Sequence, residues 1–249
     1  MSPNDLAEPL YPRPLSGAEV PNPPPALVPP RIELKGQYVT LEPQNASRHA
    51  EELFEAGHEN DDALKIWDYL AYGPWPSLDA YVQTIRQQSA SFDPIFYAMR
   101  LNDTGIACGQ GSIMDINAQF GTVEIGHIWF GLALQGSRAG TEALYLMIKH
   151  SMDDLGYRRM QWRCNSMNAK SRAAARRLGF RFEGIFHNHM IFKGRNRDTA
   201  WYSILDDEWP EVRDILQTWL APANFDASGK AKTSLGAEMQ KRAPGDRPQ

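Results

Sequence analysis

The chain has 249 residues, of which 42% are hydrophobic and 22% charged, and its formal net charge at pH 7 is -4. This is the composition of an ordinary globular protein, and the length suits one well-buried domain with tails or two small domains. The chain lacks the basic excess of a nucleic-acid-binding module. No apolar run approaches the roughly 18 residues that a membrane helix needs, and the polar, acidic start excludes a secretory signal. We therefore expect a cytoplasmic protein with no membrane or nucleic-acid partner.

The two cysteines, Cys108 and Cys164, each lie within an apolar, strand-like run. Two cysteines could form one disulfide, but two buried free thiols suit these surroundings better, because free cysteine behaves as a small apolar side chain. Buried thiols favour a reducing compartment, in agreement with a cytoplasmic location.

Both ends of the chain have the composition of tails. Residues 1–30 are rich in proline, which opposes helix formation and buries little surface, so this segment is expected to be disordered or extended as polyproline II. Residues 223–249 contain mainly small and polar side chains and are expected to be disordered as well. The folded domain should span residues 31–222.

The first half of this domain alternates between strand and helix signals. Residues 37–41 alternate polar and apolar side chains as a half-buried strand does. Asn45 or Ser47 is placed to cap a helix that continues to residue 55, and Ser77 is placed to cap a second helix. Polar turn residues that suit antiparallel hairpins separate three further strands, expected at residues 95–101, 105–116 and 122–130.

The second half of the domain inserts helices between strands. We expect helices at residues 138–155 and 169–177, strands at 159–164, 182–192 and 198–205, and a last helix from an Asp207 cap to residue 220. A meander followed by helix, strand, helix and two strands predicts an α/β (α+β) fold. Its central sheet should be mixed and mostly antiparallel, with helices on both faces.

A cluster of small residues marks the start of the helix at residue 138. The segment reads Leu134-Gln135-Gly136-Ser137-Arg138-Ala139-Gly140-Thr141. Backbone N–H groups at a helix start attract anions, small side chains let a phosphate approach them, and Arg138 would add a charged contact. An ordinary strand-to-helix turn is the alternative, because short glycine motifs occur in many folds.

A second segment carries a more specific pattern. Residues 168–184 contain Asn168, Ser171, the run Leu178-Gly179-Phe180, and Glu183-Gly184. This pattern resembles the Asn-x-x-Ser…Leu-Gly-Phe-x-x-Glu-Gly signature of GNAT acetyltransferases, particularly the RimJ/RimL-like branch. Residues 135–140 stand where that family has its Gln/Arg-x-x-Gly-x-Gly/Ala pyrophosphate loop, with Arg138 in place of the mid-loop glycine. The resemblance covers roughly residues 32–209 and implies the GNAT fold.

The resemblance implies a binding site for acetyl-CoA as co-substrate and no metal. In the family, the donor enters between two splayed strands, which would be residues 122–130 and 159–164 here. Fixed backbone dipoles on the first strand would polarise the thioester carbonyl. The residues implied in donor binding are Ile128, Trp129, Phe130, Gln135, Gly136, Ser137, Arg138, Ala139, Gly140, Thr141, Asn168 and Ser171.

The same resemblance implies catalytic roles. Ser171 would protonate the leaving thiolate, since the tyrosine that many relatives use is replaced by Ala175. For Asn168 and Ser171, helix capping is an alternative role that is compatible with donor binding. Glu124 is a lone acid in an apolar run, so it would be a desolvated base with a raised pKa, or else a solvent-facing strand residue.

Four further residues are candidates for the acceptor site. Trp75 ends a Gly-Pro-aromatic turn that resembles one overhanging the acceptor pocket in this branch, although packing over the core is an alternative. His187 and His189 are spaced to lie on one face of a strand, and histidine is a common acid–base side chain, although ordinary surface histidines are the alternative. Asp198 would bind the amine or pair with a neighbouring arginine. The position that aligns with the acidic base of RimL-like relatives is Met190, so that role does not carry over.

Two functions from different classes follow. The first is an N-acetyltransferase that transfers an acetyl group from acetyl-CoA to a primary amine, on a small molecule or a protein N-terminus, by direct attack in a ternary complex. The second is a catalytically silent acyl-CoA-binding sensor or scaffold, which the substituted loop and the missing tyrosine would allow. The sequence does not identify the acceptor amine, and a homodimer is compatible with it.

Overall fold

The structure is a computed structural model that describes residue 20 and residues 25–242, so most of the predicted N-terminal tail and residues 243–249 lie outside the described part. The strands are β1 (Leu34–Lys35), β2 (Val39–Pro43), β3 (Ile95–Leu101), β4 (Ala107–Asn117), β5 (Thr122–Phe130), β6 (Arg159–Asn165), β7 (Arg181–Phe192) and β8 (Arg195–Leu205). The helices are α1 (Ala46–His58), α2 (Asp61–Leu64), α3 (Leu78–Ala90), α4 (Arg138–Lys149), α5 (Ala169–Arg177), α6 (Trp209–Leu220) and α7 (Leu235–Gln240).

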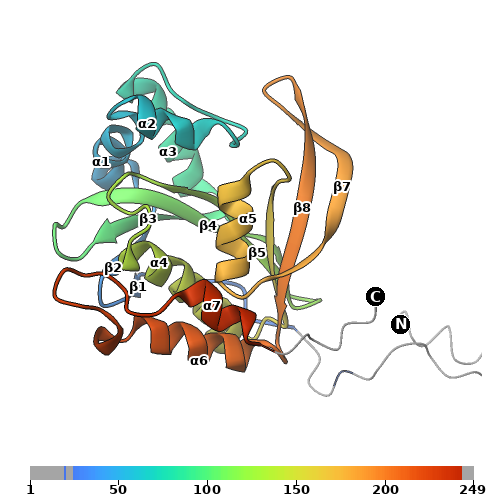
Figure 1. Cartoon of the computed structure of the whole chain (residues 1–249). Helices are drawn as coiled ribbons and strands as arrows, with labels where there is room; N and C mark the ends of the chain where they lie inside the picture. The colour runs from blue at the N-terminus through green and yellow to red at the C-terminus, as the bar shows by residue number, and fades with distance from the viewer. Residues whose placement is uncertain (1–19, 21–24, 243–249) are drawn as a thin grey trace, which may run out of the picture.

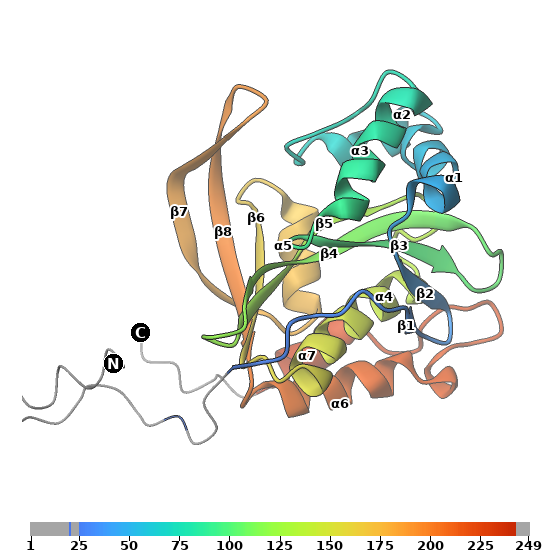
Figure 2. The ribbon, with the colours of Figure 1, turned by 180° about the vertical axis from the view of Figure 1, so that it is seen from behind.

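The strands form one eight-stranded sheet in the order β1-β2-β3-β4-β5-β6-β8-β7. Helices α1 and α3 pack on one face, whereas α4 and α6 cover the other (Figures 1 and 2). Apolar side chains such as Leu53 and Ile85 fill the first interface, and Met147 and Leu216 contribute to the second. The predicted mixed, mostly antiparallel sheet with helices on both faces is therefore confirmed.

Two of the predicted helix caps are present in the structure. Asn45 caps α1 through Ser47 and Arg48 N–H groups, and Ser77 caps α3 through the N–H of Ala80. The Asp207 cap was wrong: α6 begins at Trp209 behind Glu208, and no side chain caps it. Proline in the first turn of α6 removes one donor that a cap would otherwise satisfy.

Strands β5 and β6 are the one parallel pair among the described strands, and they separate early. Their register runs from Thr122 opposite Arg159 to Glu124 opposite Gln161, and no pairing continues beyond. On its other side, β5 has a register shift against β4, and His127 takes a φ of 51° there. The later part of β5 therefore has an edge that does not pair with β6. This agrees with the expectation that the strands at residues 122–130 and 159–164 separate.

The expected C-terminal tail is corrected over residues 223–242. Helix α7 packs against α5 and α6, and its Leu235 and Met239 side chains are only 2% and 7% exposed. Trp219 of α6 also donates from Nε1 to the Thr233 carbonyl at 3.0 Å. Two apolar side chains four residues apart behind a Ser234 cap are enough for one buried helical face, although the overall composition is that of a tail.

The last residues of the expected N-terminal tail also pack on the domain. Ala26 is buried and donates its N–H to the Ala118 carbonyl at 2.9 Å, and Leu27 donates to the Leu155 carbonyl at 2.9 Å. The ordered chain thus begins before residue 31. Both cysteines are free and buried, as predicted. Across the described part of the chain, no helix combines the length and apolar character that crossing a bilayer requires.

Candidate active site

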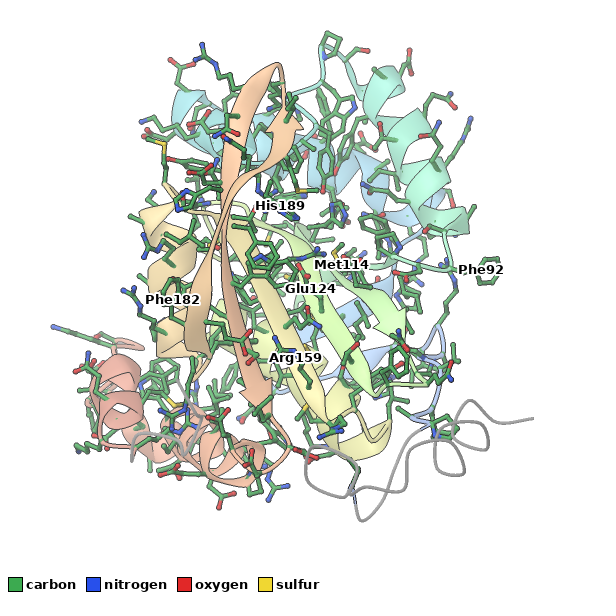
Figure 3. All side chains as sticks on the ribbon, turned by 90° about the vertical axis from the view of Figure 1, so that its right-hand side faces the viewer. Phe92, Met114, Glu124, Arg159, Phe182 and His189 are labelled. Carbon is green, nitrogen blue, oxygen red and sulfur yellow. The ribbon has the colours of Figure 1, made fainter. Side chains whose placement is uncertain are left out.

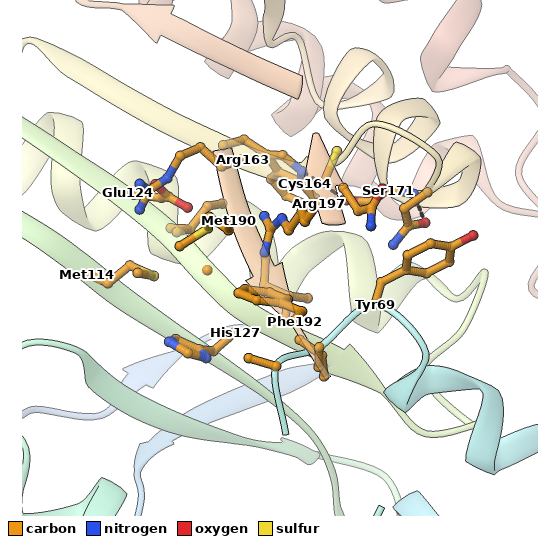
Figure 4. Close-up of a pocket in the computed structure, with 18 of the residues that line it drawn as sticks. Tyr69, Met114, Glu124, His127, Arg163, Cys164, Ser171, Met190, Phe192 and Arg197 are labelled. Atoms are coloured by element: carbon orange, nitrogen blue, oxygen red, sulfur yellow. Dashed lines mark hydrogen bonds and ion pairs between the residues drawn. The ribbon is translucent and has the colours of Figure 1, made fainter. Parts of the chain in front are cut away.

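A pocket of about 170 Å³ opens where β5 and β6 separate (Figure 4). The chain between α2 and α3 bounds it on one side, and the β7–β8 hairpin bounds it on another. Lys193 at the hairpin turn donates to the Trp67 carbonyl at 2.7 Å and so links the two walls. The lining includes Tyr69, Met114, Glu124, His127, Arg163, Cys164, Asn168, Ser171, Met190, Phe192 and Arg197.

Glu124 is the buried acid of this pocket. It lies opposite Met114 in the β4–β5 register, beneath the β7–β8 hairpin (Figure 3), and is only 3% exposed. The solvent-facing alternative is therefore wrong. Its carboxylate forms an ion pair with Arg163, whose guanidinium also binds Asp115. Burial raises the pKa of Glu124 to about 7, since desolvation outweighs the opposing effect of the Arg163 cation.

Asn168 and Ser171 both line the pocket at the start of α5. Asn168 accepts the N–H of Ser171 at 3.0 Å, so its capping role is present in the same place as its predicted site role. The Ser171 hydroxyl oxygen accepts Nε1–H of Trp162 at 3.0 Å. Because an indole nitrogen only donates, this contact leaves the Ser171 hydroxyl hydrogen free to be donated elsewhere.

The loop before α4 requires glycine at two positions. Gly136 has a φ of 67°, a left-handed conformation that favours glycine. A Cβ at Gly140 would lie 2.6 Å from the Leu134 carbonyl oxygen. Ser137 caps the helix by accepting the Gly140 N–H at 2.9 Å, and Gln135 donates its side-chain amide back to the Phe130 carbonyl. The loop is thus a tight, preformed helix start directly after β5.

Three backbone donors of this loop remain available. Within the described part of the chain, no acceptor takes the N–H groups of Gly136, Arg138 and Ala139. Unpaired N–H groups at the positive end of a helix dipole favour an anion. The loop therefore has the geometry that the phosphate prediction needs, and its backbone supplies the donors.

The Arg138 side chain is directed elsewhere, which corrects its predicted role. Its Nε donates to the Leu220 carbonyl at 3.0 Å, and its guanidinium lies between the rings of Tyr38 and Phe225, 3.9 Å from each centroid. The cation thus holds the end of α6 and the C-terminal segment against the sheet. With the guanidinium engaged by these partners, the structure gives no support to the predicted contact of this side chain with a phosphate.

Another arginine lies beside the start of α4. Arg177 donates from Nη1 to the Thr141 hydroxyl at 3.1 Å, and Thr141 itself is buried. Burial lowers the pKa of Arg177, and no carboxylate offsets this effect. The basic run that contains Arg177 is visible in the sequence, but only the packing of α5 beside α4 places this cation.

The other donor-site candidates lie along β5. Ile128 lines the pocket, the Phe130 ring lies beside the loop at Gly140, and the Trp129 side chain packs into the core under α1 and α3. Only the backbone of these three residues was assigned to the donor. Since β6 leaves this edge of β5 unpaired, the backbone there is open to a ligand, apart from the Phe130 carbonyl that accepts from Gln135.

The four acceptor-site candidates lie outside the pocket lining. Trp75 packs edge-on against Trp67 with a centroid distance of 5.1 Å, in agreement with the core alternative. On the β7–β8 hairpin, His187 is bonded to Asp198 at 2.9 Å, with 76% of its side chain exposed.

The β7–β8 hairpin shows two differences from the predictions: the hydrogen-bond partners of Asp198, and the sides of the strand on which His187 and His189 lie. Asp198 accepts from His187, Asn188 and Asn196 rather than from a neighbouring arginine, and these bonds lower its pKa to about 2. His189 bonds to Thr199, the residue next to Asp198. Adjacent strand residues face opposite sides, so the two histidines do not share a face. The cause is a register shift in β7 at Asn188, where φ is 50°.

Sequence reasoning missed a polar pair at the pocket floor. The Tyr72 hydroxyl bonds to His127 Nδ1 at 2.9 Å, and Gln110 donates to the same hydroxyl at 3.2 Å. Burial lowers the pKa of His127 to about 4, so this ring is neutral at physiological pH. Tyr72 directly precedes the Gly-Pro-aromatic turn that ends at Trp75. His127 is turned toward the pocket by the β5 bulge, which strand periodicity does not reveal.

The comparisons with known proteins agree with this architecture. A family model described as "Acetyltransferase (GNAT) domain" matches residues 39–181, more than half of the chain. The "Putative ribosomal N-acetyltransferase YdaF" of Bacillus subtilis is 30% identical over 173 residues, which cover 68% of this chain and 90% of that protein. A GCN5-related N-acetyltransferase from Brucella melitensis superposes with a TM-score of 0.86 at 42% identity, covering 89% of this chain and all of that one.

A solved structure with bound ligands also has this fold. It is the Microcin C7 self immunity acetyltransferase MccE in complex with acetyl-CoA and AMP, with a TM-score of 0.58 and 25% identity over 68% of this chain and 93% of that one. No group of three or more His, Cys, Asp or Glu side chains in residues 25–242 is placed to hold a metal ion. The separated β5–β6 pair, the preformed α4 loop and these matches identify the chain as a member of the GNAT family of N-acetyltransferases.

Proposed function

We propose that this enzyme transfers the acetyl group of acetyl-CoA to a primary amine, on a small molecule or a protein N-terminus, by direct attack in a ternary complex. The observation that carries the proposal is the layout of β5. This strand has a buried carboxylate at Glu124 and an unpaired edge after it, and it ends in a loop with free N–H groups. The acetyl-CoA-bound structure of MccE, which has this fold, supports the choice of donor.

Each part of this layout has a role. The loop N–H groups and the Arg177 cation would hold the phosphates, while Asn168 and the β5 edge would hold the pantetheine arm. The amine nitrogen attacks the thioester carbon, so that an N–C bond forms and the C–S bond breaks. Glu124 would take the proton of the amine through a water, and Ser171 would give a proton to the leaving thiolate.

The pocket favours Glu124 as the base for a physical reason. A carboxyl group with a pKa of about 7 is ionised in a substantial fraction of molecules at neutral pH and still accepts a proton readily. His127 is neutral, but its Nδ1 is already bonded to Tyr72. Glu124 is therefore the pocket group that best matches the task of a base.

The test is thiol release from acetyl-CoA by the full chain, with a panel of small amines and short peptides with free N-termini. We expect acetyl-CoA to bind in calorimetry and thiol release to depend on one class of amine. The Glu124→Gln protein serves as the control, with donor binding retained and turnover reduced. Binding without turnover for any amine would instead establish the silent acyl-CoA-binding function, and absence of binding would refute both.

A further inference from the structure

Arg197 is a pocket cation that the proposed reaction does not use. It lies on β8, lines the pocket, and sits among the lining residues between Glu124 and Ser171 (Figure 4). Its Nε is buried without a hydrogen-bond partner, and no carboxylate of the described chain forms an ion pair with it. Its guanidinium lies over the Phe192 ring, 4.4 Å from the centroid. A buried N–H donor without an acceptor, such as this Nε–H, is costly unless a ligand satisfies it.

The charged groups described around the pocket form no direct ion pair with this cation. Arg163 is already engaged by Glu124 and Asp115. Burial lowers the pKa of Arg197 and raises that of Glu124. For each of the two groups, the cost of desolvating its charge therefore exceeds the attraction that the other group provides. His127 is neutral at physiological pH because burial lowers its pKa to about 4. Among the lining residues the cations Arg163 and Arg197 outnumber the acid Glu124, and Arg197 is the one with no ion pair to a described carboxylate, so an anionic group on the substrate would pair with it.

The structure assigns an acceptor class to this pocket: we propose that the acceptor is a small amine bearing a carboxylate close to its amino group, and that Arg197 binds this carboxylate. The inference rests on the proposed transferase function and refines it. A guanidinium presents a fork of donors that matches a carboxylate. With Glu124 and Arg197 lining one pocket of about 170 Å³, the amino group would face the acid and the carboxylate would face the cation.

The same charges argue against polycationic acceptors. A polyamine or aminoglycoside would bring further positive charges against Arg163 and Arg197, with only Glu124 and the more exposed Asp115 to receive them. A free α-amino acid carries both groups, with its amine and its carboxylate on one carbon. A protein N-terminus offers no such carboxylate beside its amine.

The experiment uses matched pairs of acceptors with the full chain and acetyl-CoA. Each pair is a free amino acid and its C-terminal amide, with putrescine and a short peptide as further acceptors. We expect turnover with one or more free amino acids, and a kcat/KM about tenfold or more lower for the matching amide. Equal turnover of acid and amide, or preferred turnover of putrescine or the peptide, would overturn the inference while leaving the transferase function intact.

Variants of Arg197 locate the effect. Arg197→Met should raise KM for the amino acid by about tenfold or more, leave acetyl-CoA affinity unchanged, and remove most of the preference for acid over amide. Arg197→Lys should restore part of that preference because it restores the charge. The control is Arg195→Met, an exposed arginine two residues away on the same strand, which should behave as the wild type.

A binding readout separates this inference from the proposed function. Calorimetry with N-acetyl amino acids and their amides, in the presence of CoA, measures the carboxylate contact without turnover. Binding of the acid that Arg197→Met abolishes, with no turnover of any amine, would support the carboxylate subsite and refute the transferase. An Arg197→Met protein that retains wild-type discrimination between acid and amide would refute the subsite.

Discussion

Replacing Arg138 tests whether this side chain stabilises the fold or binds the donor. In Arg138→Met, the chain loses a charged hydrogen bond to the Leu220 carbonyl and two ring contacts at 3.9 Å. A charged hydrogen bond is worth about 1.5–3 kcal/mol, and a cation–π contact at a partly exposed site about 0.5–1 kcal/mol. The side chain is partly exposed, and methionine keeps some of the packing, so we expect a loss of about 2–3 kcal/mol in the free energy of unfolding.

Urea unfolding of the full chain, followed by tryptophan fluorescence, measures this loss through the transition midpoint. Trp219, at the end of the segment that Arg138 holds, is one of the reporters. The control is Arg158→Met, an exposed arginine that should change stability by less than about 0.5 kcal/mol.

Calorimetry with CoA and acetyl-pantetheine completes the test. We expect Arg138→Met to bind both ligands as the wild type does, because its guanidinium is engaged away from the loop. Unchanged stability together with CoA affinity reduced about tenfold or more would show that the cation reaches the phosphates, and our interpretation would be wrong.

Four further outcomes are expected. Glu142 accepts the N–H groups of Gln37, Tyr38 and Val39 at 2.8, 2.6 and 3.0 Å, so Glu142→Ala should lower the free energy of unfolding by on the order of 3 kcal/mol in urea titrations, and Glu142→Gln by less. Ser171→Ala should lower kcat on the order of 10²-fold with unchanged acetyl-CoA affinity in calorimetry; an unchanged kcat would exclude Ser171 as the acid. The kcat/KM of the wild type should rise with pH through about 7 as Glu124 ionises, and this limb should be absent in Glu124→Gln. Because the folded pKa of Glu124 lies above its usual 4.5, its contribution to stability is present below pH 4.5 and lost as pH rises through 7, so Glu124→Gln should gain stability relative to the wild type over that interval in urea titrations at several pH values.

The sequence by itself determined most of the elements and marked the loop before α4. The boundaries of β3 and β5 and the caps at Asn45 and Ser77 agree with their local signals, because periodicity and capping depend on neighbours within a few residues. The acid at Glu124 was also marked locally, as a charge in an apolar run. The short helix α7 was missed, because its two buried side chains lie in a segment with the composition of a tail.

Only the tertiary structure decided where the long charged side chains lie and which partners they contact. Arg138 is turned from the loop by Leu220, which is 82 residues away in the chain, and Arg177 reaches the start of α4 only because α5 packs beside it. His127 enters the pocket through a bulge, and Arg197 is left without a partner there. A long side chain finds its partner through packing between distant elements and through local backbone irregularities. For that reason the loop proposed to bind the donor was readable from sequence motifs, whereas the charges proposed to bind the acceptor appear only in the folded molecule.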